Sequence, residues 1–213
     1  MAIKAESLRL YLVTDPHLCA QLGVENTVEA AARGGVSMVQ LRDKDASTAE
    51  RAALATRLKP ICAQFKIPLV INDDVEAALQ SDVDGVHVGQ GDMAASLARE
   101  KLGKNKILGL SVETIEAAKQ TPSDIVDYVG ISPIYATPTK SDHKPPIGFD
   151  GLAEICTASP VYTVAIGGLK IADCARVMAT GVNGIAVVSA ICGQDDPYAA
   201  AVGLRVALDS LNS

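Results

Sequence analysis

Charged and amide side chains follow several short apolar runs of the chain, where they could take part in chemistry. Gln40, Arg42 and Lys44 alternate along the chain, so an extended backbone places them on one side. Asp73 and Asp92 follow two further apolar runs. Mg²⁺ is typically bound by one or two carboxylates, waters and phosphate oxygens, and Arg and Lys bind phosphate oxygens directly. If the fold brings these five residues together, they predict a site for a diphosphate and a metal ion.

Each of these residues also has an ordinary structural explanation. The two cations can pair with Asp43, Asp45 or another carboxylate of the acidic rim. Asp73 or Asp74 stands just before one helical pattern, and Asp92 stands before another, so all three are candidate N-caps. Taken singly, an aspartate at such a position is more often a cap than a metal ligand. The metal interpretation depends on the two carboxylates facing the two cations across one site.

A polar loop in the second half of the chain suits phosphate oxygens. Thr137, Pro138, Thr139 and Lys140 combine two hydroxyls, a rigid turn residue and one cation. Hydroxyls, backbone amides and a cation are donors that phosphate accepts well. The alternative is an ordinary solvated turn after a buried strand. The residue types of this loop favour neither interpretation by themselves.

Two further apolar runs end in small residues that allow close approach of an anion. One run is followed by Gly167 and Gly168, and the other ends with Val188 and Ser189. Glycines let backbone amides come near a phosphate, and helix N-termini add further donors. The alternative is a tight turn and a serine N-cap. Together with the cationic residues, this pattern predicts two separate anion sites and therefore two phosphorylated substrates.

Ser111 and the three histidines are open to other interpretations. Ser111 can donate to a ligand oxygen or cap the helical pattern that starts at Glu113. His87 lies inside a strand pattern, where a histidine is more often a packing residue with satisfied hydrogen bonds than a catalyst. His17 and His143 fall in loops with no evident partner.

Strand and helix patterns alternate along the whole chain. Strands are expected at Leu8–Val13, Val36–Leu41, Pro68–Ile71, Gly85–Val88, Ile107–Leu110, Tyr128–Ile131, Tyr162–Ile166 and Gly184–Val188. Helices are expected at Thr27–Arg33, Thr48–Phe65, Val75–Gln80, Met93–Leu102, Glu113–Gln120, Gly151–Thr157, Ile171–Thr180 and Tyr198–Leu211. Eight such units predict an α/β fold, a closed (β/α)8 TIM barrel of parallel strands, with an open doubly wound sheet as the alternative. No linker or composition shift interrupts residues 1–213, so one domain is expected.

Composition narrows the classes of partner. The formal charge of −6 and the absence of Trp argue against nucleic acid, and no apolar run reaches the length of a membrane span. Five scattered cysteines without C-x-x-C spacing are typical of reduced thiols. A cytoplasmic protein that binds small phosphorylated molecules, with no nucleic acid and no membrane partner, is therefore expected. The sequence leaves open whether it is a monomer or a homo-oligomer.

Taken in order, the motifs resemble those of the thiamine-phosphate synthase family from Tyr11 to Ile191. The resemblance is carried by Tyr11–Asp15, Val39–Lys44, Ile71–Asp73, Gly85–Gln90 with Asp92, Thr137–Lys140, Ile166–Gly168 and Val187–Ile191. It implies an enzyme that joins 4-amino-2-methyl-5-hydroxymethylpyrimidine diphosphate to a thiazole ethyl phosphate, releasing thiamine phosphate and diphosphate. Mg²⁺ is the implied cofactor.

The resemblance also assigns roles by motif. The pyrimidine diphosphate would be bound by Gln40, Leu41, Arg42, Asp43, Lys44, Asn72, Ser111 and Lys140. Among these, Arg42, Lys44, Ser111 and Lys140 would be catalytic. The thiazole phosphate would contact Thr137, Pro138, Thr139, Gly168, Val188 and Ser189. Mg²⁺ would be held by Asp73 and Asp92. Charge stabilisation of a diphosphate leaving group needs no side-chain nucleophile, and no Ser/His or Cys/His pair is evident.

Three other functions compete with this one. A thiazole tautomerase of the same fold would not need the aspartate pair together with Arg42, Lys44 and Lys140. A phosphosugar isomerase or epimerase would share the glycine-rich phosphate site but needs an acid/base pair, which the sequence does not reveal. A barrel that binds a phosphorylated ligand without turnover is the non-enzymatic alternative.

Overall fold

A closed barrel of eight parallel strands forms the centre of the molecule. The computed structural model describes residues 3–136 and 145–210. The strands hydrogen-bond in chain order, and β1 closes the barrel by pairing with β8. They are β1 (Leu10–Val13), β2 (Met38–Leu41), β3 (Leu69–Asn72), β4 (Gly85–Val88), β5 (Ile107–Val112), β6 (Tyr128–Ile131), β7 (Tyr162–Ile166) and β8 (Gly184–Val187).

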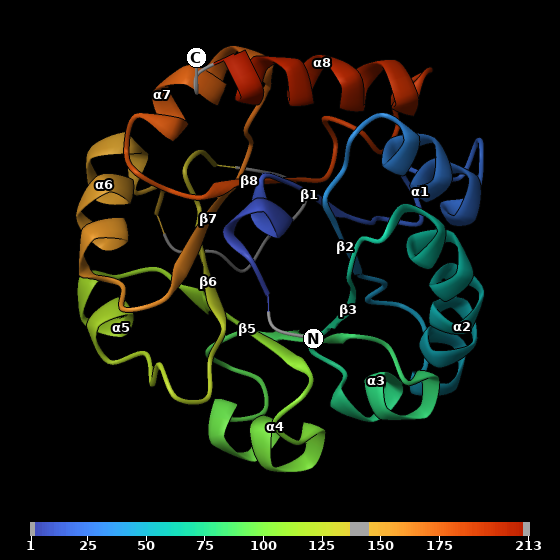
Figure 1. Ribbon diagram of the computed structural model, residues 1–213, viewed down its shortest axis with the longest axis horizontal. Helices are drawn as coiled ribbons and strands as arrows, with labels where there is room; N and C mark the ends of the chain where they lie inside the picture. Colours follow the sequence, from blue (N-terminus) through green and yellow to red (C-terminus); the bar gives the residue numbers. More distant parts are fainter. Residues whose placement is uncertain (1–2, 137–144, 211–213) are drawn as a thin grey trace.

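Helices form a ring around this barrel, as Figure 1 shows. They are α1 (Val24–Arg33), α2 (Thr48–Phe65), α3 (Val75–Ser81), α4 (Ala95–Leu102), α5 (Ile115–Lys119), α6 (Gly148–Ala158), α7 (Cys174–Met178) and α8 (Pro197–Asp209). The predicted (β/α)8 barrel is confirmed, and the open-sheet alternative is wrong because β1 pairs with β8 and closes the sheet.

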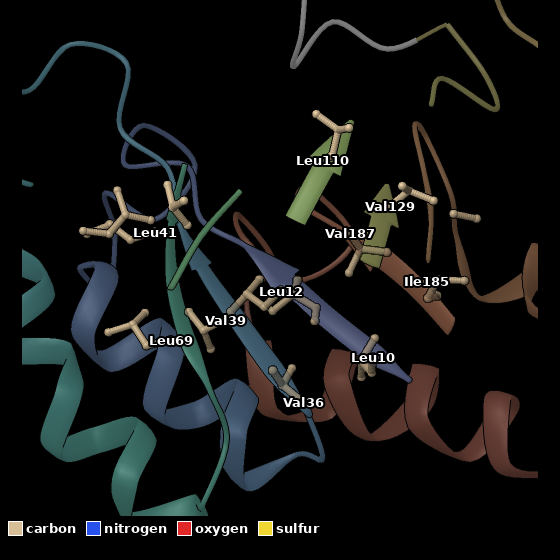
Figure 2. Close-up of a cluster of buried hydrophobic side chains, with 14 of the residues drawn as sticks. Leu10, Leu12, Val36, Val39, Leu41, Leu69, Leu110, Val129, Ile185 and Val187 are labelled. Carbon is tan, nitrogen blue, oxygen red and sulfur yellow. The ribbon is translucent and has the colours of Figure 1, made fainter. Parts of the chain in front are cut away.

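The core has two layers because most strand residues are buried on both faces. Inside the barrel lie Leu8, Tyr11, Val13, Met38, Val70, Ile107, Tyr128, Val164 and Ala186. The alternate strand residues pack outward against the helices, and Figure 2 shows part of this layer around Leu12, Val39 and Ile185. Burial of both faces explains the nearly continuous apolar runs by which the strands were recognised.

The amino-terminal end of the barrel is covered by a short 3-10 turn, η1 (Ala5–Leu8), which lies near the centre of Figure 1. This turn contacts β1, β7 and β8, and it places the fully buried Leu8 in the inner layer. The prediction that the first strand starts at Leu8 is therefore wrong, since the extended chain begins at Leu10. Apolar character alone does not distinguish a buried turn from a strand.

The helices after β4 and β5 start later than predicted. α4 begins at Ala95 rather than Met93, and α5 begins at Ile115 rather than Glu113. β5 runs on to Val112, so Ser111 lies within the strand. These shifts lengthen the loop after β4 and bring Ser111 into register with Gly130 of β6. The carboxyl ends of the strands consequently carry more polar residues than the predicted boundaries allowed.

α2 is the longest helix, at 18 residues, and its sequence explains its start. Ser47 accepts a hydrogen bond from the Glu50 amide, and the Glu50 carboxylate accepts one from the Ser47 amide at 2.7 Å, which forms a capping box. Charged residues are spread along this helix. Across residues 3–136 and 145–210, no helix combines the length and apolar character needed to cross a membrane.

Candidate active site

A cavity of about 530 Å³ opens at the carboxyl ends of the strands. The predicted site residues that line it are Gln40, Arg42, Lys44, Asn72, Asp73, Asp92, Ser111, Gly168, Val188 and Ser189. Leu41 and Asp43 do not line it: Leu41 packs in the helix-facing core, and Asp43 organises a turn. Thr137, Pro138, Thr139, Lys140 and His143 lie outside the described residues. Ten residues from six strands and their loops thus meet in one place.

Arg42 is held at the cavity by contacts with β1. The hydroxyl of the buried Thr14 accepts a hydrogen bond from the Arg42 amide at 2.9 Å. One guanidinium nitrogen lies 3.8 Å from a carboxylate oxygen of Asp15, and both side chains are largely buried. One carboxylate next to Arg42 is therefore Asp15, which lies in the loop after β1. The guanidinium is positioned before any ligand arrives.

The turn after β2 is braced by a second arginine, from α2. The Asp43 carboxylate accepts hydrogen bonds from the amides of Asp45 and Ala46, both at 3.1 Å. Arg51 donates to the Asp43 carbonyl at 2.8 Å and forms a partly buried ion pair with Asp74. Asp43 therefore shapes the loop that carries Lys44 and does so from outside the cavity.

Asp73 and Asp74 lie in different places: Asp74 caps a helix and Asp73 faces the cavity. Asp74 is the N-cap of α3, since its carboxylate accepts from the Ala77 amide at 2.9 Å. Asp73 lines the cavity and has a positive φ of 62°, a conformation that few residues other than glycine adopt. Its amide donates to the His87 carbonyl at 2.8 Å, and the Asn72 side chain donates to its carboxylate at 2.7 Å. These contacts hold the strained backbone so that the carboxylate reaches the cavity.

Asp92 is not a helix cap, so that alternative is wrong. The N-cap position of α4 is Ala94, which has no side-chain capping bond. The Asp92 carboxylate instead turns back and accepts from the Gly89 amide at 2.7 Å, and it lines the cavity. A side chain at position 89 would meet this carboxylate, because an added Cβ would lie 2.7 Å from its oxygen. The glycine therefore keeps the space that Asp92 uses.

Asp73 and Asp92 follow adjacent strands and line the same cavity, which is the arrangement that a shared cation requires. Within the described part of the chain, no group of three or more His, Cys, Asp or Glu side chains could hold a metal ion. Two carboxylates fit Mg²⁺ when phosphate oxygens and waters complete its octahedral shell. The donor set thus fits an ion that enters together with a phosphorylated ligand.

The opposite side of the cavity is formed by glycines and loops of β7 and β8. Gly167 and Gly168 both have positive φ, 120° and 69°. A Cβ on Gly167 would lie 2.8 Å from the Ile134 amide nitrogen, so this turn packs directly on the loop after β6. The tight turn of the alternative interpretation is present. Its serine cap is wrong, because α8 is capped by Asp196 and not by Ser189.

The floor of the cavity contains polar groups that the sequence analysis left without a role. Tyr11 and Tyr128, inside the barrel, have hydroxyls 2.8 Å apart. Gln40 contacts the Tyr11 hydroxyl at 2.7 Å, and His87 contacts the Tyr128 hydroxyl at 3.0 Å. His87 also lies 2.9 Å from the Ser111 hydroxyl. The expectation that His87 has satisfied hydrogen bonds is confirmed, and the ring also lines the cavity. Two tyrosines at alternate, inward positions of apolar strands were the available signal for this network.

Burial changes the acidity of both phenols. Tyr11 and Tyr128 are almost completely inaccessible to solvent. Burial raises the pKa of each hydroxyl well above its ordinary value, since a phenolate would lose its hydration. Both hydroxyls therefore keep their hydrogens throughout the neutral range.

A closed (β/α)8 barrel with a polar cavity at the carboxyl ends of its strands defines the class: this is a barrel enzyme, because active sites of this fold lie at that face. Comparison with known proteins identifies the family. The family described as thiamine monophosphate synthase matches residues 10–191.

Individual relatives agree with this match over nearly the whole chain. The chain is 50% identical to a thiamine-phosphate synthase of Psychrobacter sp., over 92% of this chain and 93% of that protein. It is 44% identical to a thiamine-phosphate synthase of Albidiferax ferrireducens, over 98% and 95% of the two chains. A solved thiamine phosphate pyrophosphorylase from Pyrococcus furiosus superposes with a TM-score of 0.89 at 32% identity, covering 98% and 99%. The chain belongs to the thiamine monophosphate synthase family.

Proposed function

We propose that the chain couples 4-amino-2-methyl-5-hydroxymethylpyrimidine diphosphate with a thiazole ethyl phosphate, giving thiamine phosphate and diphosphate. One observation carries this proposal: a single cavity has cations and a carboxylate pair at β2–β4 and a glycine-rich, uncharged wall at β7–β8. A synthase of this kind must bind two phosphorylated substrates side by side, and membership of the family supplies the reaction.

The cationic wall would bind the diphosphate. Arg42 and Lys44 lie on one face of the segment that continues β2, and both line the cavity. Departure of the diphosphate concentrates negative charge on its oxygens, so positive groups fixed beside it stabilise the transition state more than the ground state. Thr14 holds the Arg42 backbone and Asp15 lies beside its guanidinium, so little reorganisation is needed at that moment.

Asp73 and Asp92 would hold the magnesium ion between their carboxylates and the diphosphate. When bound, the ion supplies further neutralisation of charge on the leaving group. The protein contributes the placement of the carboxylates. The left-handed backbone of Asp73 and the Gly89 hydrogen bond of Asp92 aim them before metal binding.

The uncharged wall would bind the thiazole phosphate. Gly168, Val188 and Ser189 line the cavity opposite the cations. Backbone amides exposed by glycine and the Ser189 hydroxyl donate hydrogen bonds to a phosphate without adding positive charge. The thiazole would then lie across the cavity from the diphosphate, with its ring nitrogen free to attack the pyrimidine methylene carbon. Holding the two rings together supplies the proximity that a reaction without a protein nucleophile requires.

The test mixes the purified protein with both substrates and Mg²⁺ and follows product by mass spectrometry. Thiamine phosphate and diphosphate are expected in equal amounts, and no product is expected when either substrate is left out. Equal product formation after complete removal of divalent metal by a chelator would contradict the metal assignment. Tight binding of both substrates without turnover would instead support a binding protein.

A second arm separates the synthase from a thiazole tautomerase. The protein is incubated with the thiazole phosphate alone, and its isomeric state is followed by NMR. Isomerisation without any pyrimidine substrate, combined with failure to form thiamine phosphate, would overturn the proposed function.

A further inference from the structure

A continuous chain of hydrogen bonds crosses the floor of the cavity. It runs from Gln40 on β2 through Tyr11 on β1 and Tyr128 on β6 to His87 on β4 and Ser111 on β5. All four contacts lie between 2.7 and 3.0 Å. Gln40, Tyr11, His87 and Ser111 line the cavity, whereas Tyr128 lies below it, and both tyrosines are buried in the barrel interior. Five strands therefore share one polar network in an otherwise apolar barrel.

The barrel leaves space for this network at two glycines. Gly109 of β5 is in register with both His87 and Tyr128. A Cβ at position 109 would lie 2.3 Å from the Tyr128 ring and 2.4 Å from Nδ1 of His87, closer than any contact that side chains tolerate. A Cβ at Gly130 would lie 3.2 Å from the His87 ring. The missing side chains at these positions let the two rings meet over β5.

The direction of each hydrogen bond in the network follows from Gln40, the residue at its start. Nε2 of Gln40 can only donate, so the Tyr11 oxygen accepts. The Tyr11 hydrogen is then free to bond the Tyr128 oxygen, and the Tyr128 hydrogen bonds Nδ1 of His87. This orientation gives every phenol one donor and one acceptor contact.

The tautomer of His87 then determines whether Ser111 accepts or donates in its hydrogen bond with the ring. With Nδ1 accepting, a neutral His87 carries its hydrogen on Nε2 and donates to the Ser111 oxygen. The Ser111 hydroxyl hydrogen is then directed away from the ring, toward the cavity that Ser111 lines. A doubly protonated ring would instead point a hydrogen at the Tyr128 hydroxyl, whose own hydrogen would lose its acceptor in the barrel interior.

We infer that Tyr11, Tyr128 and His87 are positioning residues that fix the hydrogen-bond polarity of Gln40 and Ser111, the cavity-lining groups at the two ends of the network. They orient the Gln40 amide at one end of the cavity floor and make Ser111 a donor at the other. This inference rests on the proposed function, because the group bound at the cavity floor is taken to be the heterocycle of the pyrimidine substrate. That ring carries nitrogen atoms that accept hydrogen bonds and an amino group that donates them. If Gln40 and Ser111 have fixed donor and acceptor directions, the ring can bind in one orientation.

The main test measures the ring state of His87 by ¹⁵N NMR of histidine-labelled protein. A His17→Gln, His143→Gln double variant leaves His87 as the single histidine signal. We expect a neutral ring with hydrogen on Nε2. In Tyr128→Phe the donor to Nδ1 is lost, and we expect the two tautomers to mix. A wild-type ring with hydrogen on Nδ1, or on both nitrogens, would overturn the inference.

Steady-state kinetics supply the second readout. Tyr128→Phe and Tyr11→Phe should each lower kcat/KM for the pyrimidine diphosphate about tenfold, the scale of losing one buried hydrogen-bond partner. KM for the thiazole phosphate should stay within about twofold of the wild-type value. Tyr162→Phe is the matched control, since Tyr162 is exposed at the start of β7.

The two tyrosine variants also distinguish positioning from simple packing. Tyr11→Phe should keep the His87 tautomer, because Tyr128 still donates to Nδ1, whereas Tyr128→Phe should lose it. A packing role predicts no change of tautomer in either variant. If Tyr128→Phe does not fold, the wild-type tautomer and the kinetics of Tyr11→Phe decide. Wild-type kcat/KM in both variants would contradict the inference.

Failure of the proposed function is recognised separately. If the wild-type protein forms no thiamine phosphate, that function is wrong. The tautomer of His87 and its response to Tyr128→Phe still decide whether the positioning chain exists.

Discussion

The two walls of the cavity use different physics to present donors to an anion. At β2–β4 the donors are charged side chains, Arg42 and Lys44, accompanied by two carboxylates. At β7–β8 the lining is uncharged: glycines, aliphatic side chains and Ser189. The first wall is held by side-chain contacts such as Arg42 with Asp15, and the second by backbone that folds tightly on the loop after β6.

This difference matches what each anion does in the proposed reaction. The diphosphate gains charge as it leaves, so fixed positive groups stabilise that change. The thiazole phosphate keeps its charge throughout. It must be bound tightly, but its binding need not become stronger in the transition state. Charged side chains therefore lie beside the diphosphate, whose negative charge grows during the reaction. Neutral amides lie beside the thiazole phosphate, whose charge stays constant.

The largest effect is expected from Arg42→Gln. This variant removes a fixed charge beside the leaving diphosphate, so kcat should fall roughly 10²-fold or more, the scale for one charge-stabilising donor. KM for the thiazole phosphate should hardly change. Arg57→Gln is the matched control, because Arg57 pairs with Glu25 on the exposed outside of the barrel. An equal loss of kcat in Arg42→Gln and Arg57→Gln would mean that the effect does not come from a charge at the cavity wall.

A somewhat smaller effect is expected from Asp73→Asn and Asp92→Asn. Each should raise the Mg²⁺ concentration for half-maximal activity by about tenfold or more, since an amide is a weaker ligand for a hard cation than a carboxylate. Metal titrations of initial rate provide the measurement. Asp196→Asn is the control: Asp196 caps α8 and does not line the cavity, and Asn caps helices as well as Asp, so its Mg²⁺ curve should match wild type. A shift in the control as large as in the two variants would favour a general structural cause.

Gly168→Ala tests the opposite wall. The backbone there has φ of 69°, and a Cβ would lie 3.0 Å from Cβ of Tyr135. Strain of about 1–2 kcal/mol should displace the turn and raise KM for the thiazole phosphate roughly tenfold. KM for the pyrimidine diphosphate should be unaffected. Gly23→Ala, at another positive φ but with open space around it, controls for backbone strain far from the cavity.

The smallest effect concerns ionic strength. Screening weakens attraction between full charges more than hydrogen bonds from neutral amides, so salt should affect the two substrates unequally. Between about 0.05 M and 0.5 M salt, KM for the pyrimidine diphosphate should rise about two- to threefold more than KM for the thiazole phosphate. Parallel increases would mean that both walls bind mainly by charge. The measurement needs initial rates at several salt concentrations with Mg²⁺ held constant.

The barrel could be predicted because its strands are buried on both faces and appear as short apolar runs. Residues directly after those runs, such as Arg42 and Asp73, could be placed at one cavity for the same reason. Boundaries were less predictable where a buried turn is as apolar as a strand, as at Leu8. Which of Asp73 and Asp74 faces the cavity and which caps α3 depends on one backbone torsion angle, the φ of Asp73. Residue type does not specify this angle.

The hydrogen-bond chain below the cavity was missed for a different reason. Its members lie on five strands, and only the closed barrel brings them together. Tyr11 and Tyr128 are separated by 117 positions in the chain, and each alone resembles a bulky core residue. Periodicity predicts which face a side chain occupies, but not which hydroxyl it will meet across the barrel.

Gly109 restricts which substitutions the hydrogen-bond network below the cavity can accept in evolution. A single added carbon there collides with both the Tyr128 and His87 rings, so Gly109→Ala is disfavoured while those rings are present. Replacing one ring alone removes only one of the two collisions and breaks the network. The three positions are therefore epistatic, and substitutions at them should be accepted in pairs or triples. A Gly109→Ala change should be less harmful in a His87→Ser background than in the wild type, which makes the order of mutational steps itself a property of the fold.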